Sequence, residues 1–242
     1  MHFRISLFVK NHAFKRNNYS SLKKFGLCLY LDQHKKHTGH RKIHKPNSGA
    51  STGNGSSQPI TYHGNAVIRN PVVYIIWYEY WDDSSETDLV ENFVQDVGGT
   101  TWWDINKAYN NTARIIYGGS AYDWYSEGTE LTDDSIYWIV DDAIYYEVLP
   151  YDTNGVYLVL TSIDCNESDF CIKACGWHTY DSYYDIKYAW VGNAASLCPS
   201  SCGVRSVSIN DNQGVDAMVS VVAHELAEAV SDPYINAWYD TL

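Results

Sequence analysis

Two short, uninterrupted apolar runs constrain the fold of this 242-residue chain more than any other feature. Residues 72–77 read VVYIIW and residues 156–161 read VYLVLT, and both runs are rich in β-branched or aromatic side chains. Such runs are typical of strands buried on both faces, as in the centre of a parallel sheet. We therefore expect both to be central strands of one sheet, joined there by strands at 112–117 and 188–191.

Segments with the apolar spacing of amphipathic helices separate these strands. The predicted helices cover residues 86–97, 101–109, 132–148 and 217–231. Thr132 or Asp133 is the expected N-cap of the third helix, Gly98-Gly99 stops the first, and Pro233 closes the last. Alternation of strands and helices predicts an α/β (or α+β) fold, a mixed sheet with packed helices.

The charges divide the chain into two parts. Residues 1–48 hold 11 of the 17 Lys and Arg and one acid, which leaves 6 basic and 28 acidic residues for 49–242. We expect residues 1–58 to be a disordered basic tail with a Gly/Ser-rich linker, and residues 59–242 to be the folded domain. Because the domain is so acidic, we expect no nucleic-acid partner. No apolar stretch is long enough for a transmembrane segment, and no clean signal peptide is visible.

The cysteines gather in one loop-like region. Five of the six lie between residues 165 and 202, including two Cys-x3-Cys pairs, Cys171/Cys175 and Cys198/Cys202. Clustered cysteines favour disulfides formed in an oxidising compartment, with a four-thiolate zinc site and reduced thiols as the alternatives. The connectivity does not follow from the sequence. The Asn-x-Ser/Thr sequons of a glycoprotein occur at Asn18, Asn54, Asn110 and Asn166.

The last predicted helix carries the side chains best suited to chemistry, in the segment HELAEAVSDP. With His224 at 0° and about 100° per residue, Glu228 falls at about 40°, Asp232 at about 80° and Glu225 at about 100°. The remaining arc is apolar, and we expect it to pack on the sheet. The three acids repel one another near the negative end of the helix dipole, and no Lys or Arg follows Arg205.

Two interpretations of this stripe stay open. In the first, His224 and Glu228 bind Zn²⁺ as the two histidines of H-E-x-x-H do, and Glu225 is the general base that activates metal-bound water. Asp232 is the expected third metal ligand, with Asp240 and His178 ranked below it. In the second interpretation, the stripe is a solvated acidic face of a surface helix. His178 is interpreted first as a hydrogen-bonded structural histidine.

Several motifs resemble one known family, in the same order along the chain. They are Tyr62-His-Gly, the VVYIIWY strand, Phe170-Cys-x3-Cys-Gly-x-His178, Trp190-Val-Gly-Asn193, Cys198-Pro-x2-Cys202 and Gly214-Val-Asp-x-Met218. Over about residues 60–240 the chain resembles the EXORDIUM-like, phosphate-induced protein 1 family. The segment HELAEAVxDP followed by NAWYD is similar to the protist and microbial branch of that family.

The resemblance implies a secreted, extracellular protein associated with the cell wall and with growth responses. It implies as partner an extracellular protein or a wall component, and a chain that continues past the NAWYD segment, so we expect truncation at Leu242. Two functions follow. One is a secreted protein with a zincin-like helix, acting as a zinc-dependent, peptidase-like hydrolase of the HExxE type. The other is a non-catalytic extracellular protein of the cell wall or surface, involved in growth signalling.

Overall fold

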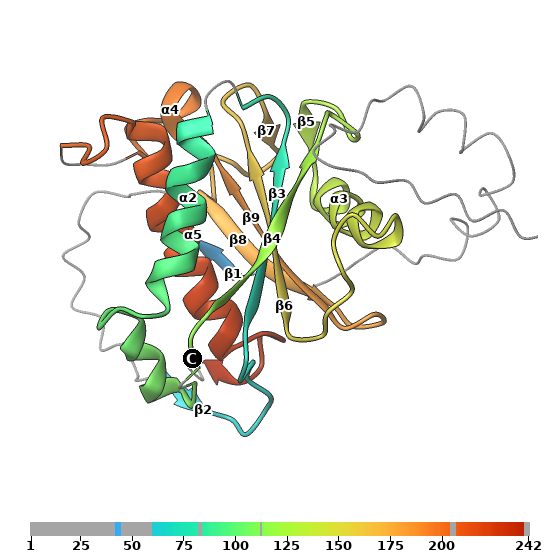
Figure 1. Ribbon diagram of the computed structural model, residues 1–242, viewed down its shortest axis with the longest axis vertical. Helices are drawn as coiled ribbons and strands as arrows, with labels where there is room; N and C mark the ends of the chain where they lie inside the picture. The colour runs from blue at the N-terminus through green and yellow to red at the C-terminus, as the bar shows by residue number, and fades with distance from the viewer. Residues whose placement is uncertain (1–41, 45–59, 82–83, 112, 204–206, 240–242) are drawn as a thin grey trace, which may run out of the picture.

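The computed structural model describes residues 42–44, 60–81, 84–111, 113–203 and 207–239, and it consists of three layers. A mixed sheet forms the middle layer. Two long helices, α2 (Ser84–Val97) and α5 (Gln213–Ser231), cover one face of the sheet, and α3 (Asp133–Tyr145) covers the other (Figure 1). The α/β prediction is confirmed. Within the described residues, none of the helices has the length and apolarity that crossing a bilayer requires.

The main sheet has six strands in the order β1-β8-β9-β6-β3-β4. Their bounds are β1 Lys42–His44, β3 Val72–Tyr78, β4 Ile116–Asp123, β6 Gly155–Thr161, β8 Gly176–Asp181 and β9 Ile186–Gly192. Strands β4, β3, β6 and β9 are parallel, whereas β8 is antiparallel to β9 and β1 is antiparallel to β8. The two apolar runs, β3 and β6, lie side by side in the interior, as predicted.

The remaining elements are short. Two-stranded sheets pair β2 (Thr61–Tyr62) with β10 (Trp238–Tyr239), and β5 (Glu130–Leu131) with β7 (Asn166–Glu167). The predicted helix at 101–109 is a 3₁₀ helix, η3 (Trp103–Tyr109), and α4 (Ala194–Leu197) is a single turn. Thr132, one of the two N-cap candidates in the sequence, is the N-cap of α3, and its side chain accepts a hydrogen bond from the Ser135 amide.

Strand β4 differs from its prediction. The strand expected at 112–117 lies at Ile116–Asp123 and passes through Gly118-Gly119, which the sequence had suggested as its end. Gly118 serves packing: a Cβ there would lie 2.3 Å from the Cε1 atom of Tyr74. Gly118 therefore allows the Tyr74 ring to pack against this edge strand, and the glycine pair does not stop the strand.

Two strands of the main sheet were absent from the sequence prediction. Strand β8 carries His178 and forms a hairpin with β9. Strand β1 belongs to the segment that was expected to be a basic tail, and its backbone pairs with β8 and extends the sheet. The start of β8 and the segment after β9 are also joined covalently, since disulfides link Cys171 to Cys198 and Cys175 to Cys202. The prediction of two disulfides among these four cysteines is confirmed. Cys165 is a buried free thiol.

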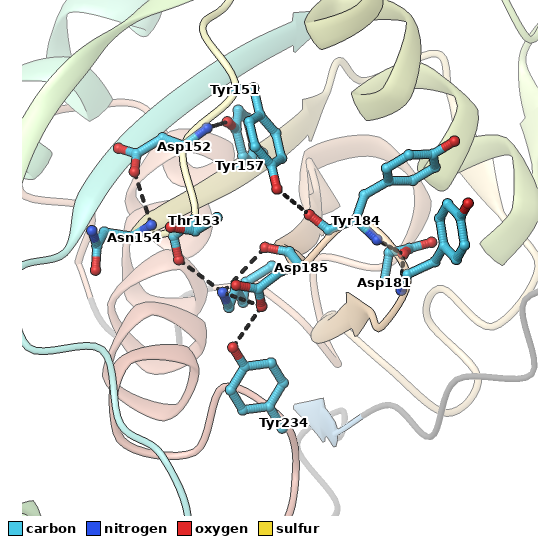
Figure 2. A network of polar contacts seen from close by, with 11 residues as sticks. Tyr151, Asp152, Thr153, Asn154, Tyr157, Asp181, Tyr184, Asp185 and Tyr234 are labelled. Atoms are coloured by element: carbon cyan, nitrogen blue, oxygen red, sulfur yellow. Dashed lines mark hydrogen bonds and ion pairs between the residues drawn. The ribbon is translucent and has the colours of Figure 1, made fainter.

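A buried lysine organises the turn between β8 and β9. The Lys187 ammonium is almost inaccessible and donates to Asp185 Oδ1 at 2.6 Å and to the Thr153 carbonyl at 2.8 Å. The Tyr234 hydroxyl donates to the same Asp185 oxygen at 2.5 Å. Figure 2 shows Asp185 at the centre of this network, with the Tyr234 ring directed at its carboxylate. The network ties the hairpin to the segment that follows α5.

We expect Asp185→Asn to destabilise the fold by about 1.5 to 3 kcal/mol, because the buried Lys187 ammonium loses its counter-charge. Asparagine tolerates the left-handed backbone of this position (φ 56°), so the change isolates the charge. The matched control is Asp104→Asn, which removes an ion pair to Lys107 (2.7 Å) in which both side chains are over half exposed. Denaturant unfolding should show a cost below about 1 kcal/mol for that control. Equal costs for the two variants would contradict the role given to the network.

Candidate functional site

Helix α5 is held against strands β8 and β9 by its apolar side. Val222, Leu226 and Val230, which the sequence predicted to pack on the sheet, are all fully buried. The helix begins after Asn212, whose side chain accepts a hydrogen bond from the Val215 amide. It approaches β8 closely at Gly176, where a Cβ would lie 2.6 Å from Val221 Cγ1. The glycine therefore permits the short distance between the helix and the strand.

His178 lies two residues beyond Gly176, so both residues face α5 from the same side of β8. Its Nδ1 atom is 3.1 Å from Glu225 Oε2, and both side chains are buried, at 1% and 0% exposure. Burial raises the pKa of the Glu225 carboxyl, while the contact with His178 opposes that shift. A polar pair of this kind in the interior is stable only if its members are bonded to each other.

Glu228 completes the group one helical turn later. Its Oε2 atom is 3.7 Å from His178 Nδ1, and its Oε1 atom is 3.4 Å from His224 Nε2. The side chain is 34% exposed, so it lies at the boundary between the buried pair and solvent. Glu228 thus bridges the two imidazoles, one on the strand and one on the helix.

The structure brings three metal-ligating side chains together, although not the set that the sequence ranked first. One ligand atom from each of His178, Glu225 and Glu228 lies within 4.8 Å of the other two, and no other such group occurs in the described ranges. His178 Nε2 and Glu225 Oε1 are buried and have no hydrogen-bond partner among the described residues. We name these three residues the His178 cluster.

The other predicted ligands lie elsewhere. Asp232 is not on the stripe, because α5 ends at Ser231 and the chain turns there. The Oδ1 atom of Asp232 accepts hydrogen bonds from the Asn236 and Ala237 amides, at 2.7 and 2.6 Å. The sequence predicted the end of the helix at Ser231, as observed, but the wheel also counted Asp232, the residue after it; Asp232 is not in the group of candidate ligands that the structure brings together. His224 is 40% exposed and contacts Glu228. Asp240 lies outside the described residues.

Sequence reasoning missed a second polar group, at the carboxyl ends of the central strands. Glu79 follows β3, is fully buried and has a left-handed backbone (φ 76°). Its Oε2 atom accepts a hydrogen bond from Ser162, which follows β6, at 3.0 Å. The Ser162 hydroxyl also contacts Asp164, which in turn accepts a hydrogen bond from Tyr125 at 2.6 Å. Burial raises the pKa of Glu79 from 4.5 to about 8. The only sequence signal was a glutamate directly after an apolar strand.

Comparison with known proteins identifies similar chains. Residues 60–242 match the family model of the phosphate-induced protein 1 conserved region. The chain is 36% identical to protein EXORDIUM-like 3 and 34% identical to protein EXORDIUM-like 5, both of Arabidopsis thaliana. Each alignment covers 74% of this chain, but only 64% and 59% of the respective relatives. Protein PHOSPHATE-INDUCED 1 of Nicotiana tabacum is 26% identical, over 76% of this chain and 68% of the relative. No solved structure matches the chain.

The raised pKa of Glu79 predicts a stability that falls with pH. The carboxyl stays neutral in the fold up to about pH 8, whereas in the unfolded chain it ionises above its ordinary value of 4.5. Its contribution is therefore complete below pH 4.5 and is lost as the pH rises towards 8. Relative to Glu79→Gln, the parent should lose about 1 to 3 kcal/mol between pH 5 and pH 8.5.

Denaturant unfolding at a series of pH values measures this difference. The control is Glu147→Gln, at an exposed position two residues after α3, and this variant should have the same stability as the parent across the pH series. A Glu79→Gln variant with the same pH dependence as the parent would mean that Glu79 ionises normally in the fold.

Proposed function

The chain belongs to the phosphate-induced protein 1 family, which includes the EXORDIUM-like proteins, and on this basis we propose that it acts outside the cell. Its role there is that of a non-catalytic protein of the cell wall or cell surface, involved in growth signalling through an extracellular protein or wall component. Because the alignments reach less than two thirds of the first two relatives, this role is proposed for the domain alone.

The paired disulfides are the observation that carries the extracellular part of the proposal. Two bridges join the same two segments, Cys171 to Cys198 and Cys175 to Cys202. Disulfides persist in secreted proteins and are rare in the reducing cytosol. Because the two bridges fix the start of β8, the surface around this strand would keep its conformation in the absence of a binding partner.

The geometry around Glu225 supports a binding role over hydrolysis. A general base must reach the water or substrate from which it takes a proton. The Glu225 carboxylate is instead fully buried and directed at His178, and Asp232, the expected third ligand, holds the backbone after α5. A zinc-dependent hydrolase of the HExxE type is the second candidate, favoured by the convergence of the His178 cluster.

An activity assay separates the two candidates. Purified, oxidised protein is incubated with Zn²⁺ and a mixed pool of peptides and esters, in parallel with Glu225→Gln. We expect the parent to hydrolyse these peptides and esters no faster than Glu225→Gln does, because Glu225 does not reach solvent. Turnover that Glu225→Gln abolishes, while a variant of the exposed Glu147 retains it, would establish the hydrolase instead.

Localisation is tested on intact cells of the source organism. Antibodies against the folded domain should label cells whose membranes have not been permeabilised, and mass mapping of non-reduced peptides should recover both disulfides. Labelling that appears only after permeabilisation would contradict the proposal.

A further inference from the structure

We propose that the His178 cluster is a binding site for one divalent transition-metal ion of the zinc class, held by His178, Glu225 and Glu228. The site joins strand β8 to helix α5. This inference is independent of the proposed extracellular role, because a bound ion serves a binding protein as a structural joint and a hydrolase as a cofactor.

The distances from His178 to the two carboxylates are close to those expected around such an ion, and all three ligand atoms lie within 4.8 Å of one another. Zinc binds imidazole nitrogen at about 2.0 to 2.1 Å and carboxylate oxygen at about 2.0 to 2.2 Å, so neighbouring ligands of a tetrahedron are about 3.3 to 3.6 Å apart. The His178 Nδ1 atom is 3.1 Å from one Glu225 oxygen and 3.7 Å from one Glu228 oxygen. Small side-chain adjustments would place all three at bonding distance from one ion.

Burial gives the second, independent observation. Glu225 Oε1 has no hydrogen-bond partner among the described residues, although the Glu225 side chain is 0% exposed. Buried polar atoms are rarely left without a partner, because an unpaired one loses the hydrogen bonds that water gives it in the unfolded chain. A cation between the carboxylates and the imidazole would offset the desolvation of Glu225 and the repulsion from Glu228.

The donor set selects the class of metal. One imidazole and two carboxylates suit zinc and the neighbouring first-row ions, whereas Ca²⁺ and Mg²⁺ prefer sites made of oxygen alone. Glu228 is the ligand nearest to solvent and marks the side from which the ion enters. His224, 3.4 Å from the other Glu228 oxygen, orients that carboxylate and is a positioning residue.

The test is metal binding by the full chain after treatment with a chelator. Six of the nine histidines precede residue 45 and provide weak sites of their own, so the decisive quantity is the difference between parent and variant. We expect the parent to bind one more equivalent of Zn²⁺ than His178→Gln or Glu228→Gln in equilibrium dialysis. Zn²⁺ at about 100 times its Kd should raise the parent Tm by about 5 to 10 °C and leave both variants unchanged.

Two further variants make the result specific. His224→Gln should retain the site with affinity reduced about tenfold, as for other residues that orient a ligand. Glu147→Gln should bind like the parent. Co²⁺ provides a readout without activity, since visible absorption bands of tetrahedral strength should appear in the parent and not in Glu228→Gln. Equal stoichiometry in parent and Glu228→Gln would overturn the proposal. Loss of Zn²⁺ binding in His224→Gln, together with retained binding in His178→Gln, would also overturn the proposal. That result would favour the ligands predicted from the sequence, His224 and Glu228 on the helix.

Discussion

The close approach of helix α5 to strand β8 is the constraint on which the candidate site depends. Gly176 has no side chain to keep Val221 away, and His178, on the same face of the strand, therefore reaches Glu225 across the interface. Interior side chains are packed as densely as in organic crystals, so a methyl group at position 176 would push α5 away from β8 and separate the His178 imidazole from the Glu225 carboxylate. Once in contact, the pair holds the interface in one arrangement, because sliding the helix would leave two buried polar groups without partners. The apolar contacts of Val222 and Leu226 stabilise the interface, and the polar pair determines its register.

The disulfides act on the same interface from outside. Cys175 directly precedes Gly176, and its bridge to Cys202 joins the start of β8 to the segment between β9 and α5. The second bridge repeats this connection four residues away along each segment. The backbone of β1 covers the outer edge of β8, so the strand that carries His178 is fixed at its start and along its edge. An oxidising environment keeps the bridges formed, and the bridges hold the interface that positions the His178 cluster.

The sequence predicted the interior of the fold well, because β3 and β6 are apolar on both faces and the Thr132 cap is a local signal. The prediction failed for elements whose structure depends on tertiary contacts. Strand β8 reads GWHTYD, which has no apolar run by which it could be recognised before the hairpin with β9 is known. In the site, the helical wheel correctly placed Glu228 near His224. The wheel also counted Asp232, although the helix was expected to end at Ser231, and the chain beyond that residue no longer follows the helical period. The partner that matters, His178, is 47 residues from Glu225 in the chain, and no spacing rule connects a strand residue with a helix residue at that separation.

The most direct measurement of this account is a double-mutant cycle between His178 and Glu225 in metal-free protein. The variants His178→Gln, Glu225→Gln and their combination are compared with the parent by denaturant unfolding at neutral pH, in the presence of a chelator. If the buried pair sets the register of α5 on β8, the two changes should be coupled by about 1 to 3 kcal/mol, because the second substitution costs little once the first has removed the contact. Additive effects, with a coupling energy of zero, would mean that the two side chains do not meet in the folded protein and would contradict the account.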